Sequence, residues 1–142
     1  MSDTNAVAVV ENFWREVWQP PQNPNAIDSL VAEDFVLTSG GIDFVSRARF
    51  KEWVIDFQSK ITHREFDILE TFQNDQGNRV SSRWHIRGKN NGMLGTQPDQ
   101  RDIRFTGTAV WAVRHDGLLL HNWVERSAWE LYLALTQPRT GG

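Results

Sequence analysis

The polar residues near the end of the chain are the ones whose types and spacing could do chemistry. His121 and, earlier in the chain, His85 carry the side chain whose pKa lies nearest physiological pH, so either could serve as a general base. Asn122 could polarise a carbonyl group by hydrogen bonding, although an amide cannot take up a proton as a base. The sequence has no Ser-His-Asp order, HExxH motif, phosphate-binding loop or dinucleotide fingerprint, so those enzyme classes can be set aside.

The aromatic residues are the second feature that needs an explanation. The chain has seven tryptophans and eight phenylalanines, and a buried indole N–H needs a hydrogen-bond partner. One explanation is an apolar cavity for a ligand. The other is a set of large core residues together with a dimer interface, and core packing alone would account for roughly half of the aromatic residues. The candidate pocket residues are Trp14, Trp18, Phe35, Phe50, Trp53, Trp84 and Trp111.

Helices must position the first of these residues. Apolar side chains recur at helical spacing from Val7 to Trp18, and Pro20-Pro21 ends that helix. A short second helix is predicted around Ile27, followed by a short strand over 35–38. A third helix is predicted over 46–60, with Phe50 and Trp53 on one face.

Strands must position the remaining residues. After Ile61 the apolar residues alternate, which predicts strands over 64–72, 79–90, 103–113 and 118–125, and then a helix over 127–135. Helices followed by consecutive hairpin-joined strands are typical of an α+β fold. We therefore predict a cone-shaped, curved antiparallel sheet with N-terminal helices enclosing a pocket.

Alternation also assigns side chains to the two faces of the sheet. Asn122 shares a face with Val124 and is the polar group predicted inside the last strand, although a buried amide satisfied by backbone groups is an equal alternative. His121 falls on the opposite, convex face. The second long strand carries a basic row that should pair with Glu65 and Asp67 on the strand before it: Arg79, Arg83, His85 and Arg87.

Length and composition exclude several classes of partner. A chain of 142 residues predicts a single domain over 1–142. The net charge of −3 is small and evenly mixed, which argues against nucleic-acid and membrane partners. The absence of cysteine excludes disulfides, thiolate nucleophiles and zinc–thiolate sites, and no metal site is expected. Without a basic leader or a long apolar run, a cytoplasmic location is expected.

The order and spacing of several short motifs resemble the SnoaL-like polyketide cyclase group of the nuclear-transport-factor-2-like (NTF2-like, cystatin-like) superfamily. The motifs are Phe13-Trp14, LVAEDFV at 30–36, Arg83-Trp84, the glycine-rich loop over 88–101, Phe105-x-Gly107 and Asp116-Gly117 leading into Trp123. The resemblance implies a deep pocket for a hydrophobic small molecule, a homodimer formed through the sheets, and no cofactor or metal. Members of this superfamily close rings by aldol chemistry, isomerise steroids or hydrolyse epoxides, and others have no known activity.

The residues that the resemblance would make catalytic are changed in this chain. The cyclases carry an acid directly after the tryptophan of the last strand, and that position is Val124 here. Glu125 is the nearest carboxylate, and it would reach the pocket only if a bulge shifted the strand register. Asn90 occupies a loop position that often holds histidine in the family, so it could line the pocket mouth or only support a turn.

Two functions from different classes follow. The first is a SnoaL-like cyclase or isomerase of a hydrophobic carbonyl compound, with Glu125 as a relocated acid assisted by Asn122. The second is a non-catalytic, dimeric ligand-binding or accessory domain that uses the same aromatic pocket, lined also by Val124 and Asn90. The loss of the expected carboxylate favours the second. A purely structural role, with side chains filling the cone, is a third alternative.

Overall fold

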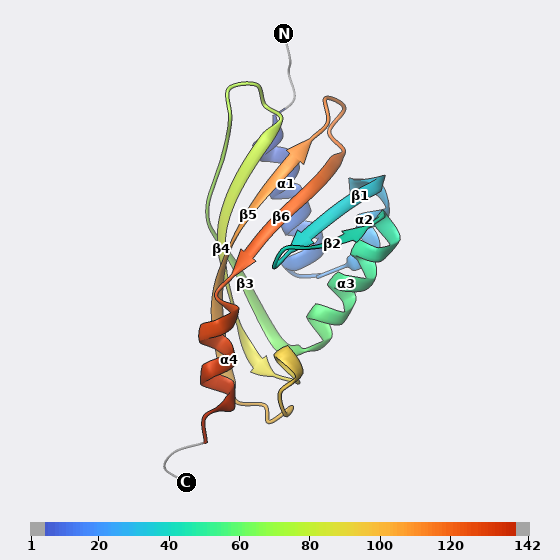
Figure 1. The fold of residues 1–142 in the computed structure, drawn as a ribbon. Coiled ribbons are helices and arrows are strands. Elements are labelled where there is room, and N and C mark those ends of the chain that lie inside the picture. The colour runs from blue at the N-terminus through green and yellow to red at the C-terminus, as the bar shows by residue number, and fades with distance from the viewer. Residues whose placement is uncertain (1–4, 139–142) are drawn as a thin grey trace.

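The computed structural model describes residues 5–138, in which helices pack against one side of a curved six-stranded sheet (Figure 1). The strand order across the sheet is β2-β1-β6-β5-β4-β3. The α+β class predicted from the sequence is therefore confirmed. The strands are β1 (Val31–Ser39), β2 (Ile42–Val45), β3 (Ile61–Gln73), β4 (Arg79–Asn90), β5 (Asp102–Val113) and β6 (Leu119–Arg126).

The sheet is mixed, which corrects the purely antiparallel sheet expected from the sequence. β1 runs parallel to β6, with Leu37 opposite Asn122, and the other neighbouring strands are antiparallel. A contact between opposite ends of the chain decides this direction, whereas local hairpin turns decide the directions of β3 to β6. β2 was not predicted because it has four residues and none of them is buried.

The helices that precede the long strands cover the concave face of the sheet (Figure 1). The first, α1 (Ala6–Phe13), continues without a break into a π-helical turn, η1 (Trp14–Trp18). The Asn5 side chain caps α1 by accepting a hydrogen bond from the Ala8 amide at 3.0 Å. The other helical segments are η2 (Pro24–Ala26), α2 (Ile27–Leu30), α3 (Arg47–Ser59), η3 (Met93–Gly95) and α4 (Ala128–Thr136).

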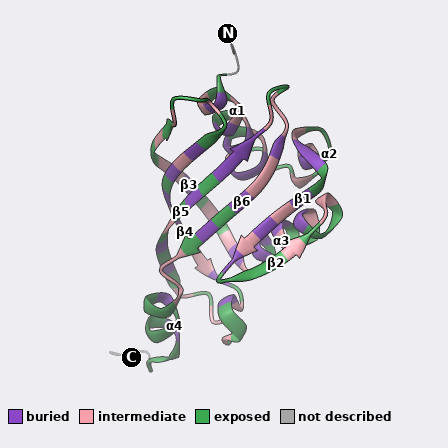
Figure 2. Ribbon diagram, turned by 45° about the horizontal axis from the view of Figure 1, so that its top comes forward, coloured by how far each residue is buried: buried purple, intermediate pink, exposed green. Residues whose placement is uncertain are grey.

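Alternation along the strands builds the core between sheet and helices. On β4, Val80, Ser82, Trp84 and Ile86 are buried while the residues between them are half-buried or exposed, a pattern visible as purple segments in Figure 2. Aromatic rings from α1 and the sheet then meet, as in the pair of Phe13 and Trp111 at 4.8 Å between ring centres. The predicted division of strand residues into an inner and an outer face is therefore observed.

The outer face of β3 and β4 carries the cross-strand ion pairs expected from the sequence. Arg87 Nη2 lies 2.9 Å from a carboxylate oxygen of Glu65, and His85 Nε2 lies 2.8 Å from one of Asp67. Arg83 pairs instead with Glu70, at 2.6 Å, because the register of the two strands shifts between Ile68 and Glu70. Three members of the basic row thus pair with acids of the neighbouring strand, whereas the guanidinium carbon of Arg79 lies 5.8 Å from the centre of the Trp123 ring.

None of the helices within residues 5–138 has both the length and the hydrophobicity needed to cross a lipid bilayer. Over the same residues, no group of three or more histidine, aspartate or glutamate side chains is placed to hold a metal ion.

Candidate functional site: an aromatic cavity

A small apolar cavity lies between the helices and the concave face of the sheet. Its volume is about 30 Å³, which is room for one or two water molecules. The rings that surround it contact each other closely, as in Trp53 and Phe57, whose ring centres are 5.0 Å apart. The lining residues are Trp14 and Trp18 of η1, Phe50, Trp53 and Phe57 of α3, and Phe66, Trp84, Ile86, Trp111, Asn122, Val124 and Arg126 of the sheet.

Most of the aromatic residues singled out in the sequence meet at this cavity. Trp14, Trp18, Phe50, Trp53, Trp84 and Trp111 all line it, together with Val124. Phe35 does not, which corrects its assignment to the pocket. Its fully buried ring packs against Phe50 at 4.5 Å and Trp111 at 6.3 Å, so it lies one layer behind the lining. The reason is that β1 lies at the far side of β6, where α3 covers it.

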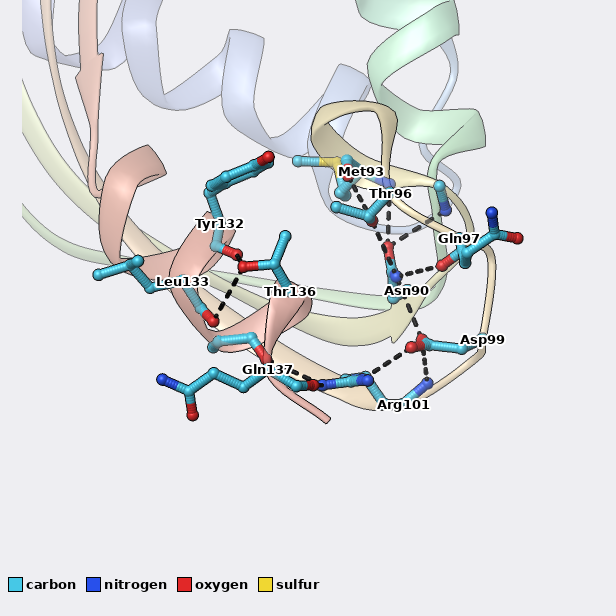
Figure 3. A network of polar contacts seen from close by, with 12 residues as sticks. Asn90, Met93, Thr96, Gln97, Asp99, Arg101, Tyr132, Leu133, Thr136 and Gln137 are labelled. Carbon is cyan, nitrogen blue, oxygen red and sulfur yellow. Dashed lines mark hydrogen bonds and ion pairs between the residues drawn. The ribbon is translucent and has the colours of Figure 1, made fainter. Parts of the chain in front are cut away.

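Asn90 also lies outside the cavity and instead holds the glycine-rich loop. Its side-chain amide donates to the Gln97 carbonyl at 2.8 Å, and its side-chain oxygen accepts from the Met93 amide at 2.9 Å and the Gly92 amide at 3.1 Å (Figure 3). The side chain is completely buried. Of the two alternatives for Asn90, the structure shows support of a turn rather than lining of the pocket.

The Asp99 carboxylate also takes part in the hydrogen-bond network of this loop. Burial acts to raise the pKa of Asp99, but hydrogen bonds from Arg101 and Asn90 outweigh it and hold that pKa below its usual value. Arg101 Nε lies 2.8 Å from an Asp99 carboxylate oxygen, and its Nη1 donates to the Ala134 carbonyl at the end of α4 (Figure 3). Asn90, Asp99 and Arg101 thus tie the loop to both β4 and the C-terminal helix.

Glu125 is placed on the outer face of β6. The register between β5 and β6 is regular from Gly107 opposite Arg126 to Ala112 opposite His121, so no bulge turns Glu125 inward. Its exposed side chain borders an outer hollow that also includes Arg83 and Thr108. This placement removes the reason for assigning Glu125 a catalytic role in the cavity.

Asn122 is the uncharged polar side chain of the lining. Its Nδ2 donates to the Val110 carbonyl at 3.2 Å, which fixes the orientation of the amide because a carbonyl can only accept. No hydrogen bond to its Oδ1 is formed within residues 5–138. The buried amide is therefore partly satisfied by the backbone, and its oxygen can still accept a hydrogen bond.

Five tryptophans line the cavity, and the indole N–H groups of three of them differ in their partners. Trp14 Nε1 donates to Ser82 Oγ at 3.2 Å. The indole nitrogens of Trp84 and Trp111 are buried without an acceptor in the described part of the chain. A buried donor without a partner is unfavourable by about 1 to 3 kcal/mol, so an acceptor brought by a ligand or a water would stabilise the site.

Arg126 is the lining residue that the sequence reasoning missed. It follows Val124 by two positions on β6, so the same alternation that puts Asn122 and Val124 inside also predicts Arg126 there. Its guanidinium carbon lies 5.0 Å from the ring centre of Phe57 and 5.7 Å from that of Trp53. Burial lowers its pKa, and the attraction of Glu125 partly opposes this.

A surface hollow of about 240 Å³ adjoins the cavity at Arg126. Trp53, Phe57 and Arg126 border both spaces, so these three side chains form the wall between them; we refer to them as the mouth. The opposite rim of the hollow is η3, which the Asn90 network holds in place.

The chemical character of the cavity follows from this lining. Its polar groups are indole N–H donors, the Asn122 amide and the Arg126 guanidinium, and the lining has no carboxylate or imidazole. The site can bind and orient an acceptor-bearing apolar molecule. Its side chains cannot take up a proton at neutral pH.

The fold and the cavity define the class of protein: an α+β domain with the NTF2-like fold, in which helices close the concave face of a curved sheet. The sequence model of the SnoaL-like domain matches residues 10–122. The chain therefore belongs to the SnoaL-like domain family, as the resemblance of its motifs indicated.

Solved structures support the fold. A candidate SnoaL-like polyketide cyclase from Jannaschia sp. CCS1 is 13% identical, with a TM-score of 0.84 over 94% of this chain and 93% of that one. A candidate polyketide cyclase from Acidithiobacillus ferrooxidans is 22% identical, with a TM-score of 0.77 over 98% and 100%. An NTF2-like protein from Exiguobacterium sp. 255-15 is 14% identical, with a TM-score of 0.68 over 84% and 98%. No curated protein matches the chain in sequence.

Proposed function

We propose that this protein binds a hydrophobic, carbonyl-bearing small molecule in the aromatic cavity and that its side chains perform no acid–base catalysis there. The observation that carries the proposal is the lining itself: aromatic rings and hydrogen-bond donors, with Val124 where the cyclases have their acid. Flat rings of a ligand would stack on the indoles, and its carbonyl oxygens would accept from the unpartnered N–H groups of Trp84 and Trp111.

Binding requires the mouth to open. A cavity of about 30 Å³ is far smaller than the few hundred Å³ that surround a drug-sized ligand. Movement of Arg126, Trp53 and Phe57 would join the cavity to the outer hollow of about 240 Å³. Of these three side chains, Trp53 and Arg126 are half-buried and Phe57 is buried. We therefore expect Trp53 and Arg126 to move.

A SnoaL-like cyclase or isomerase is the second candidate, and family membership is what favours it. With Glu125 outside the cavity, no carboxylate of the lining could remove a proton from the substrate. That proton would have to pass to another group of the substrate or to water. Holding the two reacting ends of one molecule close together would then supply most of the acceleration, and Asn122 would orient a carbonyl.

Ligand binding is tested by quenching of tryptophan fluorescence during titration with a hydroxyanthraquinone and a steroid ketone. We expect saturable quenching by at least one of them. Val124→Met extends a side chain into the cavity and should weaken binding at least tenfold, whereas Trp123→Phe on the outer face of the same strand should leave the affinity unchanged. Circular dichroism confirms that both variants fold. No response to either class of ligand, or equal affinity in Val124→Met, would contradict the proposal.

Release of a cyclised or isomerised product in the same mixtures would support the second candidate. Binding without formation of a product would support the ligand-binding role instead.

A further inference from the structure

Arg126 places a positive charge at the mouth of an otherwise uncharged cavity. Its position on β6 puts its side chain on the same face as Asn122 and Val124, which also line the cavity. The guanidinium lies over two stacked rings of α3, Phe57 at 5.0 Å and Trp53 at 5.7 Å. The helix thus provides an aromatic support that holds the charge between the cavity and the outer hollow.

No acidic side chain forms an ion pair with this guanidinium in the part of the chain that the structure describes. Glu125, its neighbour in sequence, alternates to the opposite face of the strand, although the two residues border the same outer hollow and the charge of Glu125 attracts the guanidinium. The nearest acid in the hollow, Asp56, pairs with Lys60 at 3.0 Å. By contrast, three basic side chains on the outer face of β4, Arg83, His85 and Arg87, pair directly with acids of β3. Arg126 is therefore a half-buried cation with no direct ion pair among the described residues.

The rings of Phe57 and Trp53 leave the N–H donors of the guanidinium available to bind an anion. Aromatic rings offer no conventional hydrogen-bond acceptor, and the N–H donors lie in the plane of the guanidinium, where they match the two oxygens of a carboxylate. A cation that has lost part of its hydration gains more from such a partner than one in open water. Burial already lowers the pKa of Arg126, which is the signature of that lost hydration.

We propose that Arg126 binds the carboxylate, or another conjugated oxyanion, of an acidic ligand whose rings occupy the aromatic cavity. This inference rests on the proposed function and specifies its ligand class as hydrophobic aromatic acids. The anion would lie at the mouth, on the Phe57 and Trp53 side, and the apolar body would point toward Trp84 and Trp111. Arg126 is then a specificity-determining residue, and no proton transfer is assigned to it.

The test compares two probes that differ only in charge, anthraquinone-2-carboxylate and anthraquinone-2-carboxamide, by quenching of tryptophan fluorescence at pH 7.5. We expect the wild-type protein to bind the carboxylate at least tenfold more tightly, a ratio typical of a charge-assisted bidentate contact. Arg126→Gln should remove that preference and leave the affinity for the carboxamide within about threefold of wild type. Arg126→Lys, which keeps the charge and loses the planar fork, should retain part of the preference.

Arg104→Gln is the matched control, because Arg104 is an exposed arginine on the outer side of β5 and its loss changes the net charge equally. It should bind both probes as the wild type does. Thermal melting with unchanged midpoint shows that each variant is folded. Equal affinity of the wild-type protein for both probes, or a preference that survives in Arg126→Gln, would overturn the assignment of Arg126 while leaving the binding cavity standing. Failure of the wild-type protein to bind either probe would overturn the assignment too, and only this outcome would also count against the proposed function.

Discussion

At the scale of single residues, the cavity depends on a glycine between two large side chains. On the inner face of the sheet, Gly107 lies opposite Trp84 on one side and opposite Arg126 on the other. A Cβ atom added at Gly107 would lie 2.2 Å from Cζ2 of Trp84, so the indole lies directly over this residue. The Phe105-x-Gly107 motif therefore has a physical reason, which is the space needed by the Trp84 ring.

Gly107→Ala is expected to destabilise the protein by roughly 1 to 3 kcal/mol, because the Trp84 ring must leave its position in a tightly packed core. Chemical denaturation measures the change. Thr106→Ala, at an exposed neighbouring position of the same strand, is the control and should cost less than about 1 kcal/mol. Gly107→Ala should cost less in a Trp84→Leu background than in the wild type, and an equal cost in both backgrounds would argue against the steric explanation.

His121, on the outer face of β6, should make the stability of the folded protein depend on pH. Its ring stacks on Trp123 with centres 3.8 Å apart, and its Nε2 lies 2.8 Å from Thr38 Oγ1. Burial lowers the pKa of His121, Arg79 lowers it further, and Asp43 acts in the opposite direction. The folded protein therefore holds this proton less well than the unfolded chain does.

Because the unfolded chain takes up the proton more readily, the contribution of His121 to stability is complete above the ordinary histidine pKa of about 6.5 and decreases as the pH falls below it. Denaturation midpoints between pH 8 and pH 5 should show this decrease. In His121→Gln the slope over that range should be smaller. An unchanged slope would assign the pH dependence to other groups.

At the scale of elements, the loop between β4 and β5 is built as a rigid rim rather than a flexible connection. Asn90 ends β4 and bonds to backbone groups of Gly92, Met93 and Gln97, and Arg101 joins the far end of the loop to α4 (Figure 3). Since η3 borders the hollow outside the mouth, the shape of that hollow depends on this network.

Asn90→Ala should destabilise the protein by roughly 2 to 4 kcal/mol, because it leaves several buried backbone groups without partners. The loss should be accompanied by faster hydrogen exchange over residues 91–101, measured by mass spectrometry. Gln97→Ala, which removes an exposed side chain of the same loop and keeps the carbonyl that Asn90 binds, is the control and should leave both quantities nearly unchanged. Protection that persists in Asn90→Ala would show that other contacts hold the rim.

At the scale of the whole molecule, the outer face of the sheet presents apolar side chains that the chain itself does not cover. Phe72, Val110 and Trp123 are 54%, 36% and 38% exposed, and the Arg79 guanidinium lies 5.8 Å from the centre of the Trp123 ring. Phe72, Arg79 and Val110 border one hollow of this face. A homodimer joined through the sheets would bury these groups, as the sequence led us to expect.

We predict that the protein is dimeric at micromolar concentration and that Trp123→Arg makes it monomeric, because a second charge beside Arg79 cannot be buried favourably. Light scattering after size-exclusion chromatography measures the mass. Trp129→Arg, at a 64% exposed position on α4, is the control and should remain dimeric. A monomeric wild-type protein, or dissociation of the Trp129 variant alone, would contradict a dimer through the sheet.

The sequence by itself determined the features that depend on local periodicity. Alternation predicted which side chains of β4 and β6 face inward, including Asn122 and Val124, and it predicted the ion pairs of Glu65 and Asp67. The same rule would have identified Arg126, had it been followed two residues further along the strand. These features are predictable because a strand exposes its side chains with a period of 2 wherever it lies.

Only the tertiary structure decided what depends on contacts between distant segments. Pairing of β1 with β6 made the sheet mixed and left Phe35 behind the lining, and regular pairing of β5 with β6 kept Glu125 outside. The packing of α3 placed Phe57 and Trp53 beneath Arg126 and reduced the cavity to about 30 Å³. Such outcomes depend on how closely whole elements approach, and neither composition nor periodicity carries that information.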